Sequence, residues 1–281
     1  MKMHMFITGL TAAATCVAAT TIDPANKYGY GANIGWVNAA GDVANGAVIG
    51  QAFCSGYLWG ANVGWIHLGN GEPPNGKAYG NVSSRDYGIN HDGAGRLSGY
   101  AYGANIGWIN FEQTRGKPMV NLATGDLSGY AWGANVGWIN LATLATLTID
   151  PGPSVDGDNI PDAWELGHTN TIWVLNGGDA DGDGMPDEAE YLADTDPLDP
   201  GDYLRITDFQ TLKTTNWVTW PVKTTRLYTL QHAAALSNGM SWATTSSPFI
   251  PTSGPGVTET VSGVADTNRF YRVEARPPLS P

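Results

Sequence analysis

Cysteine and charged residues are both scarce in this chain of 281 residues. There are two cysteines, Cys16 and Cys54, and charged residues make up 14% of the sequence, against about 25% in ordinary globular proteins. A framework of several disulfides is therefore excluded as the source of stability. Basic residues number 14 against 26 acidic ones and form no cluster, so nucleic acid is not an expected partner.

Catalytic sequence patterns are also missing. The five histidines are scattered, and the chain contains no zinc-binding His-Glu-x-x-His, no Gly-x-Ser-x-Gly nucleophile turn and no phosphate-binding loop. Carboxylate pairs of the kind that cleave glycosidic bonds are few outside one acidic segment. We therefore predict a non-enzymatic protein.

A long apolar run opens the sequence. Residues 5–19 are apolar or small after a short basic start, and Val17-Ala-Ala19 fits a signal-peptide cleavage site. The run is too short to span a bilayer, so residues 1–19 predict secretion to the outside of the cell and no membrane span. After cleavage Cys54 would be a buried thiol, an intermolecular bridge or a reactive group, and its apolar strand favours burial. With the leader retained, Cys16 could pair with Cys54.

Glycine is abundant, at 37 residues, and much of it lies in a phrase that occurs four times. The copies are Tyr30-Gly-Ala-Asn-Ile-Gly-Trp36, Trp59-Gly-Ala-Asn-Val-Gly-Trp65, Tyr102-Gly-Ala-Asn-Ile-Gly-Trp108 and Trp132-Gly-Ala-Asn-Val-Gly-Trp138. Gly and Asn suit tight turns, whereas aromatic and β-branched residues suit strands. Such repetition is typical of a scaffold, and residues 20–149 are predicted to form a repeat-built antiparallel β domain.

The repeated tryptophans allow two interpretations. They could form a buried aromatic ladder, or an exposed platform on which sugars stack as in a lectin. Because each Trp has Ile or Val beside it, we expect the buried ladder. Trp138→Ala should then cost about 3–5 kcal/mol of unfolding free energy.

The negative charge is concentrated in residues 150–202, which hold 15 acids and no Lys or Arg. Within this segment, residues 179–190 match the twelve-residue calcium loop D-x-[DN]-x-[DN]-G-x5-E at every defined position. Carboxylates and a main-chain carbonyl at this spacing can wrap a hard cation, and Gly184 permits the sharp turn. The predicted calcium ligands are Asp179, Asp181, Asp183, the Met185 carbonyl, Asp187 and Glu190.

A second loop of this kind precedes it at residues 154–165. Ser154 occupies the first position, and Asn159 replaces the usual Gly, which Asn can do because it tolerates the left-handed conformation. Its predicted calcium ligands are Asp156, Asp158, the Ile160 carbonyl, Asp162 and Glu165. Residues 194–199 could add ligands or simply end the helix that follows the second loop.

These two loops resemble bacterial thrombospondin type 3 repeats, whose usual sequence is DxDGDGxPDxxE followed by the motif TDP. The resemblance covers residues 154–200 and implies a calcium-stiffened spacer between extracellular domains. Dockerins also pair loop–helix units, but the chain has no second helix with equivalent recognition residues. A calmodulin-like sensor is not expected, because no helix is predicted before either loop.

The sequence pattern changes again in residues 203–276, which contain six short predicted strands separated by turn residues. Regularly spaced strands over this length predict a small β-sandwich of immunoglobulin or fibronectin type. The strands are expected at 203–209, 216–220, 226–231, 241–244, 258–261 and 269–274. Residues 277–281 are assigned as a tail. The fold class is therefore mainly β, with a repeat domain, a loop–helix segment and a C-terminal sandwich.

The order of these parts resembles that of secreted bacterial proteins whose subunits build extracellular helical filaments. The resemblance implies a structural subunit that assembles head to tail with copies of itself. Residues 20–30 have no hairpin partner before them, so we expect this segment to donate a strand to a neighbouring subunit. The alternative is a secreted adhesin or carbohydrate-binding module, with a glycan as partner.

Overall fold

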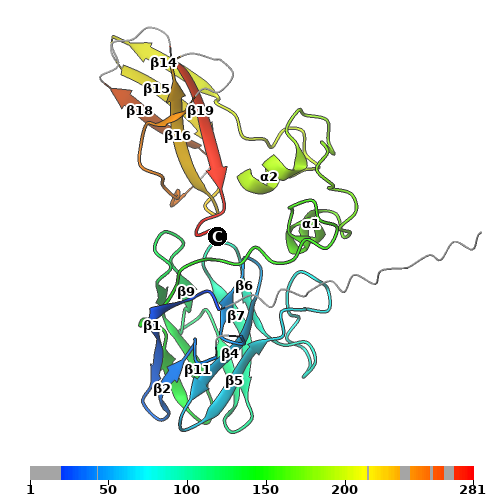
Figure 1. Ribbon diagram of the computed structural model, residues 1–281, viewed down its shortest axis with the longest axis vertical. Coiled ribbons are helices and arrows are strands. Elements are labelled where there is room, and N and C mark those ends of the chain that lie inside the picture. The colour runs from blue at the N-terminus through cyan, green and yellow to red at the C-terminus, as the bar shows by residue number, and fades with distance from the viewer. Residues whose placement is uncertain (1–19, 43, 214, 235–240, 254–255, 263–268) are drawn as a thin grey trace, which may run out of the picture.

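The computed structural model describes residues 20–281 except 43, 214, 235–240, 254–255 and 263–268. The predicted signal peptide and Cys16 lie outside the described residues. Figure 1 shows a β-barrel at one end, two C-terminal sheets at the other, and a loop segment with two short helices running along one side between them. The chain is mainly β with antiparallel sheets, as the sequence predicts.

The first part is a closed antiparallel barrel of eight strands. Four hairpins lie side by side in chain order, and the ring closes where the first strand pairs with the last, with Tyr30 opposite Asn140. The hairpin strands are β1 (Ile22–Gly31), β2 (Gly35–Asn38), β4 (Cys54–Gly60), β5 (Gly64–Gly69), β7 (Leu97–Gly103), β8 (Gly107–Phe111), β11 (Tyr130–Gly133) and β12 (Gly137–Asn140).

Five short strands accompany the hairpin strands. They are β3 (Val48–Ile49), β6 (Ile89–His91), β13 (Leu144–Thr146) and the separate pair β9 (Met119–Val120) and β10 (Leu127–Ser128). Cys54 is a free, fully buried thiol in this region, and burial raises its pKa to about 12. The buried-thiol interpretation is therefore confirmed.

The repeated phrase is the turn of each hairpin. The Gly before the Trp has a φ of 75° to 78° in all four copies, a conformation that strongly favours Gly. The first Gly faces inward, where the Ile or Val of the same turn folds over it. A Cβ on Gly31 would lie 2.7 Å from Ile34, and the other three copies are equally tight. Both glycines are therefore required by the geometry.

The Asn of each turn links its hairpin to the one before it. Asn62 Nδ2 donates to the carbonyl of Ile34 at 3.0 Å, and Asn105 donates to Val63 at 3.1 Å. Asn135 continues the series to Ile106. Asn33 in the first hairpin donates to Val136 in the last, at 3.1 Å, and so completes a closed ring of four hydrogen bonds. The same residue of the repeat thus joins all four hairpins.

The tryptophans lie on the outside of the barrel, so the prediction of a buried ladder is wrong. Trp36 is 57% exposed, and Trp65, Trp108 and Trp138 are 41–45% exposed. Neighbouring residues of a strand face opposite sides of the sheet, so a Trp beside a buried aliphatic residue must point outward. The interior is filled instead by small and aliphatic side chains, including Val37, Ile66, Ile109 and Ile139, all at most 2% exposed.

Residues 20–30 pair within their own chain, so the predicted strand donation by this segment is also wrong. β1 forms the first hairpin with β2 and pairs with β12 and β13, which closes the barrel. Thr21 accepts a hydrogen bond from Thr146, and Ile22 belongs to the barrel core. The partner missing from the local sequence is supplied by strands more than 100 residues away.

The C-terminal part contains two three-stranded antiparallel sheets that share one hydrophobic cluster, which includes Val218, Trp220 and Leu230. Five predicted strands agree with the structure within a few residues, whereas the strand expected at 203–209 begins at Asp208. The strands are β14 (Asp208–Leu212), β15 (Thr215–Pro221), β16 (Leu227–Ala233), β17 (Ala243–Thr244), β18 (Gly256–Ser262) and β19 (Phe270–Arg276).

The end of the chain returns to the barrel and does not form a free tail. Ile149 N donates to the carbonyl of Leu279 at 2.8 Å, and the Leu279 side chain packs against the barrel core. Figure 1 shows this end between the barrel and the C-terminal sheets.

The opposite orientation of adjacent residues gives a direct test of the barrel. Ile139→Ala should lower the free energy of unfolding by about 2–5 kcal/mol because it empties part of a packed core. Trp138→Ala should cost only about 1 kcal/mol, since it removes an exposed ring and one aromatic contact. Urea unfolding of the two variants measures both values. A larger loss for Trp138→Ala than for Ile139→Ala would contradict this orientation.

Candidate metal centre

Two short helices follow the two acidic loops. α1 (Asp162–His168) and α2 (Asp187–Ala193) each begin directly after a proline, Pro161 or Pro186. The helices do not extend N-terminally past these prolines. Each proline instead fixes the extended backbone that leads into the helix. The proline therefore sets where the ninth and twelfth loop positions enter the helix.

The two loops have the same internal hydrogen bonds. The carboxylate at the ninth position accepts from the backbone N–H of the second residue, as Asp162 does from Val155 and Asp187 from Ala180, both at 2.9 Å. The fifth-position carboxylate accepts from the seventh N–H in both loops. Asn159 and Gly184 both have positive φ values, 74° and 97°, so Asn159 supports the same turn as glycine.

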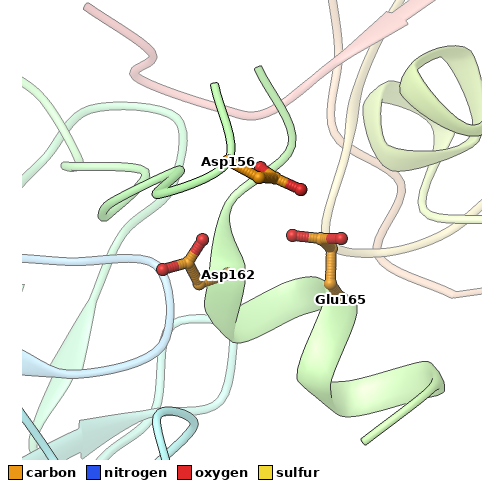
Figure 2. Close-up of side chains that lie close together, drawn as sticks. All are labelled: Asp156, Asp162 and Glu165. Atoms are coloured by element: carbon orange, nitrogen blue, oxygen red, sulfur yellow. The ribbon is translucent and has the colours of Figure 1, made fainter. Parts of the chain in front are cut away.

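Three carboxylates of the first loop converge. Atoms of Asp156, Asp162 and Glu165 all lie within 4.8 Å of one another. Figure 2 shows Asp156 projecting from the loop toward Glu165 of α1, with Asp162 at the start of the same helix. Asp158 lies in the same loop but outside this group, and its Oδ1 accepts bonds from Ile160 N and Ser154 Oγ.

The second loop brings together Asp179, Asp181 and Asp183, again within 4.8 Å. Asp179 accepts backbone bonds from Gly182 and Gly184, which folds the loop around its first residue. Asp187 and Glu190, on α2, are outside this group of three. Burial raises the pKa of Glu190, and the charge of Asp181 adds to the rise.

Buried carboxylate oxygens without partners are the most unusual property of these loops. Glu165 and Glu190 are fully buried. Both oxygens of Glu165 and Oε2 of Glu190 have no hydrogen-bond partner among the described residues. The same holds for oxygens of Asp156, Asp158, Asp181, Asp183 and Asp187. Burying an unpaired carboxylate is very costly, and such groups are normally paired or coordinate metals.

The electrostatics agree with this geometry. Burial raises the pKa of Glu165 to about 8, and the negative charges of Asp156, Asp158, Asp162 and Asp187 add to the shift. Burial also raises the pKa of Glu190 to about 7, followed by repulsion from Asp181, while a hydrogen bond from Thr195 opposes the rise. Asp187, which contributes to the shift of Glu165, belongs to the second loop.

The residues present fit hard cations. Every candidate side chain offers oxygen alone, and the carbonyls of Ile160 and Met185 occupy the seventh position of each loop, where calcium loops supply a main-chain ligand. The Ile160 side chain is fully buried in a small cluster with Leu175 and Tyr191. That cluster holds the two loops together on their apolar side.

The loop segment is also connected to both β parts, through residues that the sequence patterns do not single out. Arg226, which precedes β16, is buried and donates to the carbonyls of Tyr191 and Leu192 at the end of α2. On the other side, Tyr191 Oη donates to Gln51 of the barrel at 3.1 Å. A lone Arg or Gln carries no motif, so only the fold shows these contacts.

Asp194 ends α2, which is one of the two roles that the sequence leaves open for residues 194–199. It adopts the left-handed conformation at the C-cap, with φ 61°, and its carboxylate pairs with Arg226 at 3.2 Å. Asp202 likewise pairs with Lys223, at 2.8 Å. Both acids pair with cationic side chains, and Asp194 also accepts a hydrogen bond from Trp164 Nε1, at the eleventh position of the first loop, at 3.3 Å.

A cavity of about 280 Å³ lies at the junction of the three parts. Its ionisable lining groups include His91, whose two ring nitrogens bond Gly50 O and Gly95 N, and the Arg226–Asp194 pair. Burial lowers the pKa of His91, which keeps the ring neutral. These groups connect elements of the fold to one another.

No known protein family, curated protein or solved structure matches this chain. Of the helices in the described residues, neither has the length and apolar character required to cross a membrane.

The raised carboxylate pKa values predict an inverse pH dependence for the metal-free protein. Folded Glu165 and Glu190 bind protons that the unfolded chain, with a glutamate pKa near 4.5, has already released. Stability should therefore fall as pH rises from about 5 to 8. Melting temperatures in metal-free buffer measure this slope, and Glu165→Gln/Glu190→Gln should flatten it. A wild-type melting temperature that rises across this range would contradict the assignment.

Proposed function

We propose that this chain is a non-enzymatic, extracellular structural protein whose two acidic loops bind calcium and thereby stiffen the connection between its two β parts. The observation that carries this proposal is the set of buried, unpartnered oxygens in the two loops. A cation in each loop neutralises the charges that repel one another there and satisfies the oxygens that the protein leaves without partners.

Calcium is the cation that suits these ligands best. Oxygen-only sites favour calcium, magnesium or manganese over zinc and copper, which prefer nitrogen or sulfur. Magnesium requires near-ideal octahedral geometry, whereas calcium accepts more ligands in a flexible arrangement. Twelve-residue loops with a glutamate at the last position provide the flexible arrangement that calcium accepts. Dissociation constants of about 10⁻⁵ to 10⁻³ M are expected, as for extracellular modules.

The contacts of α2 explain how such binding would stiffen the protein. Glu190 lies in the same helix as Tyr191, which contacts both Arg226 of the C-terminal part and Gln51 of the barrel. A cation that fixes Glu190 therefore also fixes the helix to which both β parts are attached. In its absence, residues 150–202 should loosen first.

Calorimetry with calcium tests the metal proposal. We expect two bound ions per chain. Glu190→Gln should weaken binding at the second loop at least tenfold, because even the loss of a residue that only hydrogen-bonds a metal ligand typically weakens metal binding by about this factor. Glu188→Gln is the matched control, because Glu188 is an exposed acid on the same helix. Calcium should also raise the melting temperature. Absence of calcium binding, or equal effects of the two variants, would refute the proposal.

Head-to-tail assembly into a filament is the second element of the proposed function. Its support is the resemblance of the domain order to filament subunits, together with an open sheet edge. β14 pairs only with β15 among the described strands, all five of its residues are exposed, and Phe209 and Leu212 are 50% and 63% exposed. An exposed apolar edge is a template for pairing with another chain. The C-terminal sheets are proposed to form an immunoglobulin- or fibronectin-like sandwich that presents this edge.

Electron microscopy and sedimentation of the purified protein in calcium test assembly. We expect filaments that shorten or disappear with Leu212→Lys, because a charge on an edge strand blocks pairing. Leu147→Lys is the matched control, since Leu147 is similarly exposed, at 59%, but belongs to the barrel. Monomers at all concentrations, or equal loss of assembly in both variants, would rule out pairing at β14.

A further inference from the structure

The outward positions of the barrel hairpins have a composition unlike that of an ordinary solvated surface. Along the paired strands these positions are occupied by Tyr or Trp at every site except Asn38, His67, Asn110 and Asn140. No Asp, Glu, Lys or Arg occurs among them. We call this set of outward Tyr and Trp side chains the aromatic belt. The hairpin strands that carry it surround the barrel, and their turns lie at the end away from the two helices (Figure 1).

The belt consists of four copies of one ring cluster. In the first hairpin Trp36 lies directly opposite Tyr30, with ring centroids 5.0 Å apart, and diagonally across from Tyr28 at 6.3 Å. The same diagonal contact of Tyr with the closing Trp recurs in the other hairpins at 5.9–6.2 Å. The rings are steeply inclined to one another, at 75–78°, and so present ring faces as well as edges to the outside.

Polar side chains fill the positions between hairpins. Asn38 is the cross-strand partner of Trp59, Asn110 of Trp132 and Asn140 of Tyr30. Cross-strand partners have Cβ atoms about 4.5–5.5 Å apart, so each amide lies beside an aromatic ring. Asn38 and Asn140 each accept a backbone bond through Oδ1. Their Nδ2 groups have no hydrogen-bond acceptor among the described residues, which leaves donors next to the rings.

These properties of the aromatic belt favour some binding partners over others. One lysine of the described residues lies against the belt, Lys27, whose Nζ is 5.6 Å from the centroid of the Tyr28 ring. A single cation gives little attraction to a polyanion such as nucleic acid or an acidic polysaccharide. Because the belt encircles a closed barrel, a second copy of the chain could cover only one side of it. A neutral sugar has an apolar face of C–H groups that stacks on Trp or Tyr and hydroxyls that accept from Asn amides. A repeating polymer can engage several equivalent clusters at once.

We propose that the aromatic belt binds a neutral polysaccharide, with each hairpin cluster acting as one weak subsite and Trp36, the most exposed, as the principal one. Tyr87 adds a further ring to the cluster of Trp108, with ring centroids 4.9 Å apart. Several weak subsites on one rigid barrel give high avidity for a polymer without strong binding of a single sugar. This role is independent of calcium binding and of filament assembly.

Affinity electrophoresis in gels that contain hydroxyethylcellulose, galactomannan or dextran tests the proposal, with polygalacturonate as the charged comparison. We expect at least one neutral polymer to retard the protein and polygalacturonate to have no effect. Trp36→Ala should weaken retardation, and the combined Trp36, Trp65, Trp108 and Trp138 alanine variant should raise the dissociation constant at least about 100-fold, because avidity is lost. Trp173→Ala is the matched control, since Trp173 is 68% exposed but lies outside the belt.

A second measurement does not depend on the variants folding. N-bromosuccinimide oxidises exposed tryptophans, so the retarding polymer should protect Trp36 but not Trp173 in the wild-type protein, as seen by peptide mass mapping. Absence of retardation by all three neutral polymers overturns the proposal. So does retardation that Trp173→Ala reduces as much as Trp36→Ala. A belt that instead mediates pairing of two copies would be revealed by a dimer that Trp36→Ala dissociates, without retardation by any polymer.

Discussion

The closed ring of asparagine bonds is the constraint on which the barrel depends. Each bond joins the turn of one hairpin to the main chain of the hairpin before it, and the bond from Asn33 to Val136 connects the first hairpin to the last. Once the ring is closed, the inward glycines and their overlying Ile or Val fill the narrow interior. The large aromatic side chains have no space in this interior and must lie outside. The closed set of asparagine hydrogen bonds therefore also determines the aromatic surface.

A second constraint is electrostatic and acts at the junction. The loop segment concentrates acids that the rest of the chain does not balance, and it buries two glutamates completely. Within the part of the chain that the structure describes, side chains of Lys and Arg form ion pairs only with acids outside the loops, namely Asp194 and Asp202. On this basis we propose a folded state that is complete only when cations are bound, and α2, through its contacts, would link that requirement to both β parts.

Much of this arrangement could be predicted from local sequence, and the exceptions have physical causes. The repeated phrase predicts its turns because Gly and Asn at those positions have few conformational alternatives, and the twelve-residue spacing predicts which acids share a loop. The side of the sheet on which Trp138 lies depends on alternation with Ile139, which outweighs the hydrophobicity of Trp. The partners of β1 and the role of Arg226 arise from contacts between residues far apart in sequence, which no local pattern encodes.

The central claim is that cations complete the two acidic loops, and anomalous diffraction from crystals grown in calcium tests it most directly. The account predicts two anomalous peaks per chain, each about 2.3–2.6 Å from carboxylate oxygens, one contacting Glu165 and the other Glu190. A structure in which the same crystals show no peak in either loop, with these glutamates bonded to protein groups or water, would contradict the account.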